Sequence, residues 1–359
     1  MSLPFMQPYM GLGNSLQTAQ GGAGGGPSVG GWVELARTTL GSAGDTLAVS
    51  SFANKRYYMV LYNSGVSTEL TEYLTFGSGG SADTGSNYSN RISDGGGADS
   101  TFTSRANMVA AAKSGATRPE FGVSYISNLA SKEKLMIHHA VNEHTIGAGT
   151  APARNEVAGK WANTSNALDT ISWGNFGSGD FPIGAEMVVL GWDPEDTHTS
   201  NFWEELASVN ASGSSTNLSS GTITAKKYLW IQCYSEGTGG DIITTFNNDT
   251  GSNYTRRYSI DGGADGSDVN QTAIDNMHNA GLPNDDAFSN WFIINNSANE
   301  KLIMGHSVQN GSAGAGTAPP RLEFAGKWTN TASQITEIDF DSSSGNFGSN
   351  SIIKVWGSD

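Results

Sequence analysis

Arginine, glutamate and histidine side chains recur at matching places in two parts of the sequence. Arg154 and Glu156 lie two residues apart, and Arg321 and Glu323 repeat them 167 positions further on. A separation of two puts both side chains of a pair on the same face of a β-strand. Each pair can form an ion pair, but catalysis usually needs a second carboxylate or a nucleophile close by, and neither motif contains one. We expect both pairs to brace the fold.

A histidine repeats at the same distance, as His139 and His306. Strand alternation places His139 on one face together with three apolar residues, Leu135, Ile137 and Val141. A buried, hydrogen-bonded imidazole is therefore our prediction for each copy, and a ligand or general base is the alternative.

Two other features contain residue types that can bind metals. Residues 94–99 and 261–265 are glycine-acid turns, but they fit no loop of alternating oxygen ligands such as an EF-hand. An adjacent-histidine site would exist in one copy only, because Gly305 stands where His138 would recur. We expect no metal and no cofactor. No phosphate-binding, nucleophile-elbow, H-E-x-x-H or C-x-x-C motif occurs, so we predict that the protein is not an enzyme.

Two Asn-Tyr pairs, Asn87-Tyr88 and Asn253-Tyr254, each follow a Thr-Gly-Ser turn. An aromatic ring with a polar tip beside an amide suits sugar binding when both side chains are exposed. These four residues are our candidate contacts for a glycan on a host surface.

Composition favours strands and turns. The 359 residues include 47 glycines, and only 15% of the chain is charged, which is poor for long helices. A net charge of −15 argues against nucleic-acid binding, which normally needs a basic face. No apolar run approaches the length of a membrane span, no signal peptide is recognisable, and we expect no membrane insertion.

The longest repeated stretch covers residues 147–164 and 314–331, where a Gly/Ala/Pro loop leads into a strand and ends near Trp161 or Trp328. With the turn signals every 8–15 residues, this repetition predicts an all-β chain. It should form two tandem jelly-roll-like antiparallel β-sandwiches, related by internal duplication, at 31–193 and 202–359, joined by a short linker, 194–201. Ser104–Lys113, in a poorly matched stretch, has some helical character.

Residues 1–30 differ from the rest. We interpret them as an extended, apolar N-terminal arm on a Gly-rich tether, which docks on another subunit of a homo-oligomer. The arm has no charged side chain over its first 20 positions and carries these apolar residues: Leu3, Phe5, Met6, Tyr9, Met10 and Leu12.

Several runs of the second copy resemble a β-sandwich module found, often in tandem, in virion proteins of marine phages and archaeal viruses. The runs are Lys226-Lys-Tyr-Leu229, Phe246-Asn-Asn-Asp249, Gly251-Ser-Asn-Tyr254, Gly262-Gly-Ala-Asp265, Asn299-Glu-Lys-Leu302 and Gly314-Ala-Gly-Thr-Ala-Pro319. The resemblance begins near residue 31 and is weaker in the first copy, where 77–83 holds a Gly-rich insertion.

The resemblance implies a non-enzymatic protein located in the virion: a tail fibre, receptor-binding or capsid-surface decoration subunit. It would contact other virion proteins through its arm. Two alternatives remain. A tandem jelly-roll capsid protein needs its two sandwiches fused side by side and specialised for different neighbours. A secreted carbohydrate-binding or hydrolytic sandwich is disfavoured, because the chain shows neither a signal peptide nor paired catalytic acids.

Overall fold

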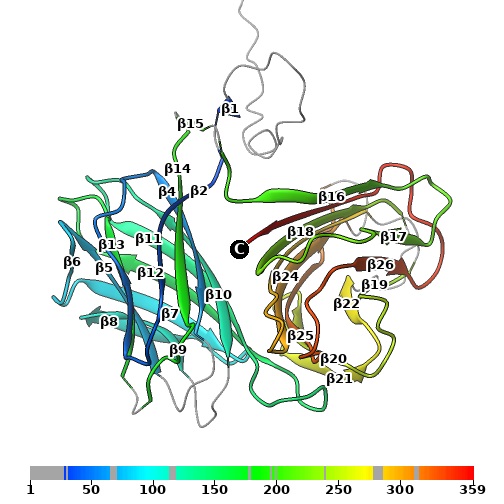
Figure 1. Cartoon of the computed structure of the whole chain (residues 1–359), viewed down its shortest axis with the longest axis horizontal. Helices are drawn as coiled ribbons and strands as arrows, with labels where there is room; N and C mark the ends of the chain where they lie inside the picture. The colour runs from blue at the N-terminus through cyan, green and yellow to red at the C-terminus, as the bar shows by residue number, and fades with distance from the viewer. Residues whose placement is uncertain are drawn as a thin grey trace, which may run out of the picture.

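The computed structural model consists of β-strands joined by turns and loops (Figure 1). It describes residues 28–29, 31–64, 71–112, 119–176, 179–194, 196–198, 200–237, 240–277, 286–310 and 315–359. The arm residues 1–20 lie outside the described residues. Within the described ranges there is no helix with the length and hydropathy needed to cross a membrane.

The first half of the chain forms two antiparallel sheets. The large sheet has eight strands in the order β2 (Val33–Thr39), β14 (Glu186–Trp192), β4 (Tyr57–Asn63), β10 (Glu120–Ser127), β11 (Lys134–Asn142), β12 (Ala153–Trp161), β7 (Tyr88–Asp94) and β8 (Ser100–Arg105). The small sheet contains β3 (Thr46–Val49), β13 (Thr170–Asn175), β5 (Thr71–Ser78) and β6 (Ser81–Ala82), with β9 (Met108–Ala112) also paired to β5.

The second half repeats this arrangement. Its large sheet runs β16 (Glu204–Asn210), β27 (Ile352–Ser358), β18 (Tyr228–Ser235), β23 (Ala287–Ile294), β24 (Lys301–Gln309), β25 (Arg321–Trp328), β20 (Tyr254–Ile260) and β21 (Gly266–Gln271). Its small sheet runs β17 (Asn217–Ser219), β26 (Ile338–Ser342), β19 (Ile242–Phe246) and β22 (Ile274–Met277). The strand order of the two large sheets corresponds position by position. A separate two-stranded ladder pairs β1 (Ser28–Val29) with β15 (Thr197–His198).

The helical expectation for Ser104–Lys113 is wrong. Its described part contributes to strands β8 and β9, and the second copy has β21 and β22 at the matching place. Met108 and Ala110 are fully buried, with the partly buried Val109 between them. Burial at every second position stabilises a strand, and this packing outweighs the helical preference of the alanines.

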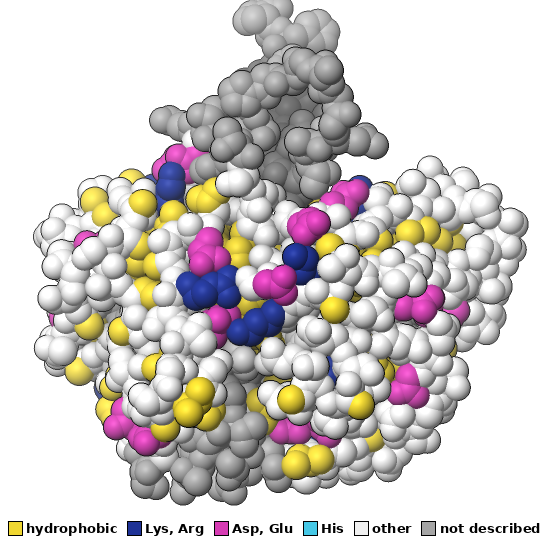
Figure 2. All heavy atoms as spheres, viewed as in Figure 1, with side chains coloured by type: hydrophobic (Ala, Val, Ile, Leu, Met, Phe, Trp, Pro, Cys, Tyr) yellow, Lys and Arg dark blue, Asp and Glu magenta, His cyan; other side chains and the backbone are white. Residues whose placement is uncertain are grey.

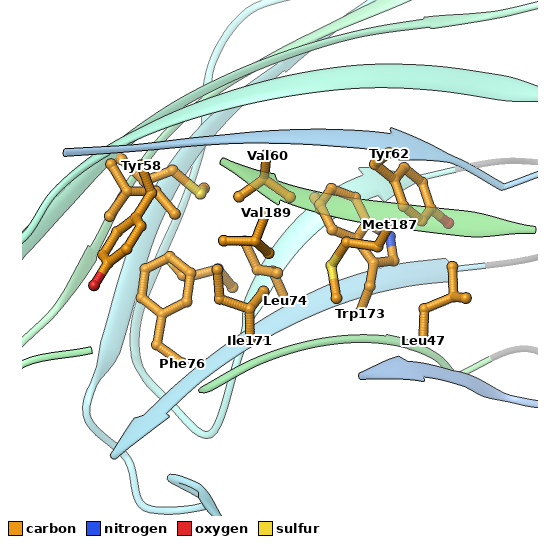
Figure 3. Close-up of a cluster of buried hydrophobic side chains, with 14 of the residues drawn as sticks. Leu47, Tyr58, Val60, Tyr62, Leu74, Phe76, Ile171, Trp173, Met187 and Val189 are labelled. Carbon is orange, nitrogen blue, oxygen red and sulfur yellow. The ribbon is translucent and has the colours of Figure 1, made fainter. Parts of the chain in front are cut away.

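Each sandwich has its own hydrophobic core between its large and small sheets. In the first, alternate residues of β4 point toward the small sheet and pack on its aromatic and aliphatic side chains (Figure 3). The labelled residues are Leu47, Tyr58, Val60, Tyr62, Leu74, Phe76, Ile171, Trp173, Met187 and Val189. Trp161 and Trp328 lie in the two cores at 1% and 0% exposure.

A third hydrophobic cluster joins the two sandwiches through the outer faces of the large sheets, and we call this contact the seam. It includes Met59, Leu61, Phe121, Val141, Val188 and Leu190 from the first sandwich and Tyr228, Trp230, Phe292, Leu302, Met304 and Trp356 from the second. Burying one such side chain contributes about 1.5–3 kcal/mol. The seam therefore holds the two sandwiches together as one four-layered body, with the large sheets inside (Figure 1).

Candidate functional site

The two matching histidines meet at the centre of the seam. The ring centroids of His139 and His306 lie 4.4 Å apart. In each sheet the histidine has a glutamate as its cross-strand partner: His139 pairs with Glu156, and His306 pairs with Glu323. Each sandwich therefore contributes one His-Glu pair, held in place by neighbouring strands, to a shared cluster.

His139 does lie on the same face of β11 as Leu135 and Ile137, but this face points away from its own sandwich core. Leu135 and Ile137 are 56% and 55% exposed, and the second sandwich provides the burial of the imidazole. The histidine that enters the core of the first sandwich is His138, which has no exposed surface. Its Nδ1 lies 2.9 Å from Ser124 Oγ.

Arg154 crosses the seam and links three carboxylates. It forms the predicted ion pair with Glu156, donates to Glu323 at 3.3 Å, and places NH2 at 2.8 Å from Asp265. The matching Arg321 is 54% exposed and forms the predicted ion pair with Glu323. The two arginines thus occupy equivalent positions in different environments, because only Arg154 is enclosed by both sandwiches.

The turn at 94–97 of the first sandwich closes over Asp265 from the second. Gly96 has φ = 73°, and a Cβ at this residue would lie 2.1 Å from Asp265 Cγ. Glycine is required for two reasons: the backbone is left-handed, and Asp265 occupies the space of a side chain. Both predicted glycine-acid turns are turns, and one of them supplies a seam carboxylate.

Burial controls the charge of this cluster. Burial lowers the pKa of His139 to about 3, with further lowering from His306, His138 and Arg154. The pKa of His306 is also lowered, mainly by burial. The pKa of Glu156 is raised, because burial and the neighbouring Glu323 outweigh the effect of Arg154. At neutral pH the imidazoles are therefore uncharged, and the positive charge beside the carboxylates comes from Arg154 and Arg321.

The cluster contains residue types that can bind zinc. Glu156, His306 and Glu323 each offer a ligand atom, and these atoms lie within 4.8 Å of one another. Arg154, however, already donates to both carboxylates, and its charge would repel a divalent cation held there. The geometry fits an ion-paired joint between sandwiches better than a metal centre.

A second charged group lies at the rim of the seam. Glu186 of β14 accepts from Arg37 (3.0 Å) and, across the seam, from Lys227 Nζ and Tyr228 Oη (both 2.7 Å). Burial opposes the charged form, but these donors lower the pKa of Glu186. Figure 2 shows basic and acidic side chains gathered near the centre of this view, where Figure 1 marks the C-terminus.

The repeated tryptophans belong to buried stacks rather than to a binding surface. Trp161 Nε1 donates to Asp83 at 2.8 Å, and Lys134 Nζ lies 5.3 Å from the centroid of the indole ring. The ammonium group also donates to backbone carbonyls, including that of Asn163 at 2.9 Å. The second sandwich repeats the stack with Lys301, Trp328 and Asp249.

The prediction that the tyrosines of the two Asn-Tyr pairs face a ligand is wrong. Tyr88 and Tyr254 have no exposed surface, and the Oη of Tyr88 lies 2.6 Å from the carbonyl oxygen of Phe76. Asn87 donates to Asp83 at 2.8 Å, and Asn253 donates to Asp249 in the same way. These two aspartates are not among the site residues predicted from the sequence, although each stands four residues before its asparagine.

At the position of His138, the two sandwiches exchange a large and a small residue between neighbouring strands. His138 is the cross-strand partner of Val157, and the matching pair in the second sandwich is Gly305 and Phe324. A Cβ on Gly305 would lie 2.1 Å from the Phe324 ring. The first sandwich therefore fills this space with His138 from β11, and the second fills the equivalent space with Phe324 from β25.

A polar pocket of about 230 Å³ lies at the β20, β21 and β22 strands of the second sandwich. Arg256 lines it and pairs with Asp268 at 2.8 Å and Asp275 at 2.9 Å. The carboxylates that line it are thus ion-paired with one arginine, an arrangement that differs from the acid-and-base pair of a glycosidase.

No model of a known protein family and no curated protein sequence matches this chain.

Proposed function

We propose that this protein is a non-enzymatic structural subunit of a virus particle. The observation that carries the proposal is a nested pattern of strand pairing, present twice. In the second sandwich β17 pairs with β26, β18 with β23, β19 with β22 and β20 with β21. In the first, β3 pairs with β13, β4 with β10, β5 with β9 and β7 with β8.

Strands pair in this nested order when one long hairpin is rolled up, and successive pairs then alternate between the small and the large sheet, as they do here. A hairpin rolled in this way is a jelly roll, an architecture of viral capsid and lectin domains. We infer that 31–193 and 202–359 are two jelly rolls that arose by internal duplication. In each, two strands outside these nested pairs widen the large sheet: β11 and β12 lie between β10 and β7, and β24 and β25 lie between β23 and β20.

The repeated motifs support a role without catalysis. The Lys-Trp-Asp stacks, Arg154 and the tyrosines of the Asn-Tyr turns have their polar groups committed to internal contacts. A residue whose donors and acceptors are already paired inside the fold has little left for a substrate.

The seam favours one form of this function, that of a tandem jelly-roll capsid protein. Such a protein needs two sandwiches fused side by side and specialised for different neighbours. Here the large sheets are fused through a hydrophobic cluster, and the matching arginines Arg154 and Arg321 have different partners. A tail fibre, receptor-binding or decoration subunit that attaches through the N-terminal arm is the other form. The carbohydrate-binding alternative loses its two aromatic contacts, because Tyr88 and Tyr254 are buried.

The test is quantitative mass spectrometry of purified particles. A capsid subunit would be among the most abundant proteins of the particle, whereas a tail or receptor-binding subunit would be present in a few copies. Either result supports a virion protein and separates the two forms. Absence from the purified particles would refute the proposal.

A further inference from the structure

The two sandwiches share the central positions of the seam, such as Met59 and Trp230, but they bury different ends of equivalent faces. Half A of each large sheet is the end of the outer face around Phe121 and Val141 in the first sandwich, and around Phe288 and Val308 in the second. Phe121 and Val141 are fully buried, whereas Phe288 and Val308 are 41% and 40% exposed. Half A is thus covered in the first sandwich and open in the second.

Half B, at the other end of the same faces, shows the reverse. In the second sandwich its apolar side chains are covered: Phe292 is 5%, Leu302 0% and Met304 5% exposed. The matching residues of the first sandwich, Tyr125, Leu135 and Ile137, are 38%, 56% and 55% exposed. Half B has similar chemistry in the two sandwiches, since each contributes one aromatic and two aliphatic side chains.

The open residues form two patches. Leu135 and Ile137 lie two residues apart on one face of β11, and Phe288 and Val308 are cross-strand partners on β23 and β24. Tyr125, the cross-strand partner of Ile137, lies between the first patch and the seam, because its ring centroid is 6.5 Å from that of Phe292. Scattered apolar residues are normal on a protein surface, but clustered ones mark interaction sites. Here each open patch has a covered equivalent: half A is covered in the first sandwich, and half B is covered in the second.

We propose that a second copy of this chain covers these patches. Half A of the second sandwich of one molecule packs on half B of the first sandwich of the next molecule. Within one chain, half A of the first sandwich packs on half B of the second in the same way. Such a contact is heterologous, and it closes into a ring if the rotation permits. The inference depends only on these exposures and on the repeated strand order, and it stands or falls independently of the viral role.

The contact between copies should be smaller and more polar than the seam. The central histidines already contact each other within each chain. In addition, Gln232 and Asn290 of the second sandwich stand where half A of the first has the buried residues Leu61 and Val123. A smaller, more polar contact predicts reversible association that depends on protein concentration.

One contact within the chain specifies which residues should meet between copies. The rings of Phe121 and Tyr228 lie 6.1 Å apart in the seam. Their equivalents are Phe288 and Tyr57, so Phe288 of one copy should approach Tyr57 of the next. The full-length variants Tyr57→Cys and Phe288→Cys are mixed and treated with a short bismaleimide. The native Cys233 is fully buried and should not react.

We expect a crosslinked dimer from the mixture and none from either variant alone. A second measurement uses the mass of the full-length protein in solution, by sedimentation or light scattering across a concentration series. Ile137→Asp and Val308→Asp should each raise the dissociation constant of self-association roughly tenfold or more, since each tenfold change corresponds to about 1.4 kcal/mol. Ile183→Asp, at a residue 71% exposed outside both halves, is the matched control and should have no effect.

Mixing the two variants tests the head-to-tail arrangement directly. Ile137→Asp keeps an intact half A, Val308→Asp keeps an intact half B, and the mixture should regain association that each variant lost. Three results would overturn the proposal: a wild-type protein that stays monomeric, face variants that associate normally, or a mixture that does not recover. Loss of association only in Phe5→Asp and Tyr9→Asp variants would likewise overturn it, by assigning self-association to the arm.

Discussion

Acidification to pH 5 should destabilise the folded protein, because it holds imidazoles that burial keeps neutral. Burial lowers the pKa of His138 from its ordinary value of 6.5 to about 4, and that of His139 to about 3. At a pH between the pKa of the folded state and that of the unfolded state, the imidazole binds a proton in the unfolded chain and stays neutral in the folded chain. Stability is therefore complete above about pH 6.5 and declines as the pH falls.

The loss of stability at pH 5 follows from the difference between this pH and the ordinary pKa of histidine. At pH 5 both groups are about 1.5 pH units below their ordinary pKa and still above their folded pKa. Each unit corresponds to about 1.36 kcal/mol, so each of these two imidazoles should remove about 2 kcal/mol, and His138 and His139 together about 4 kcal/mol. His306, whose pKa is also lowered, acts in the same direction. Glu156 acts in the opposite direction, since its raised pKa lets the folded state take up a proton more easily.

The assay is urea unfolding at pH 7 and pH 5 of the wild type and of single variants. His139→Asn should lose about 2 kcal/mol of the pH dependence, because it removes one of the three buried imidazoles. His144→Asn is the matched control, because the side chain is exposed, its φ of 61° suits asparagine, and the substitution leaves all three buried imidazoles in place. Equal stability of the wild type at both pH values, or a full pH dependence in His139→Asn, would refute the reasoning.

Three further predictions concern stability and are checked by the same unfolding assay at pH 7. Trp161→Phe should cost about 1.5–3 kcal/mol, since it removes a hydrogen bond to a carboxylate; no loss would show that this bond is unimportant. Arg154→Met should cost about 3 kcal/mol or more, because it leaves a buried carboxylate unpaired, whereas Arg321→Met at the exposed equivalent position should cost less than about 1 kcal/mol. Similar losses would contradict the asymmetry of the seam. His138→Gly and Val157→Phe should each destabilise but partly compensate when combined, with a coupling of about 0.5–3 kcal/mol, and strict additivity would argue against the exchange.

Periodicity and repetition made the all-β fold predictable. Strand pairing depends on which side chains alternate, and the chain carries that alternation twice, as in β11 and β24 around His139 and His306. The same alternation correctly placed Arg154 beside Glu156. It failed at Ser104–Lys113, where a local helical preference competed with burial that depends on distant strands.

The candidate site was less predictable, because alternation identifies a face without stating what covers it. His139 and its apolar neighbours are on one face, as expected, but the cover is another sandwich. Tyr88 was expected to be exposed because it follows a turn, and the structure buries it through contacts with Phe76 and Asp83. A turn residue can point either way, and only its tertiary neighbours decide which.

The sequence by itself determined the strand content, the two matching copies and the residue pairs within each strand, since these depend on local spacing. Only the tertiary structure decided that equivalent residues differ in environment. Phe121 is buried and Phe288 exposed, and Arg154 is enclosed whereas Arg321 is open. The physical reason is that two copies joined through different halves of one face cannot have equivalent neighbours.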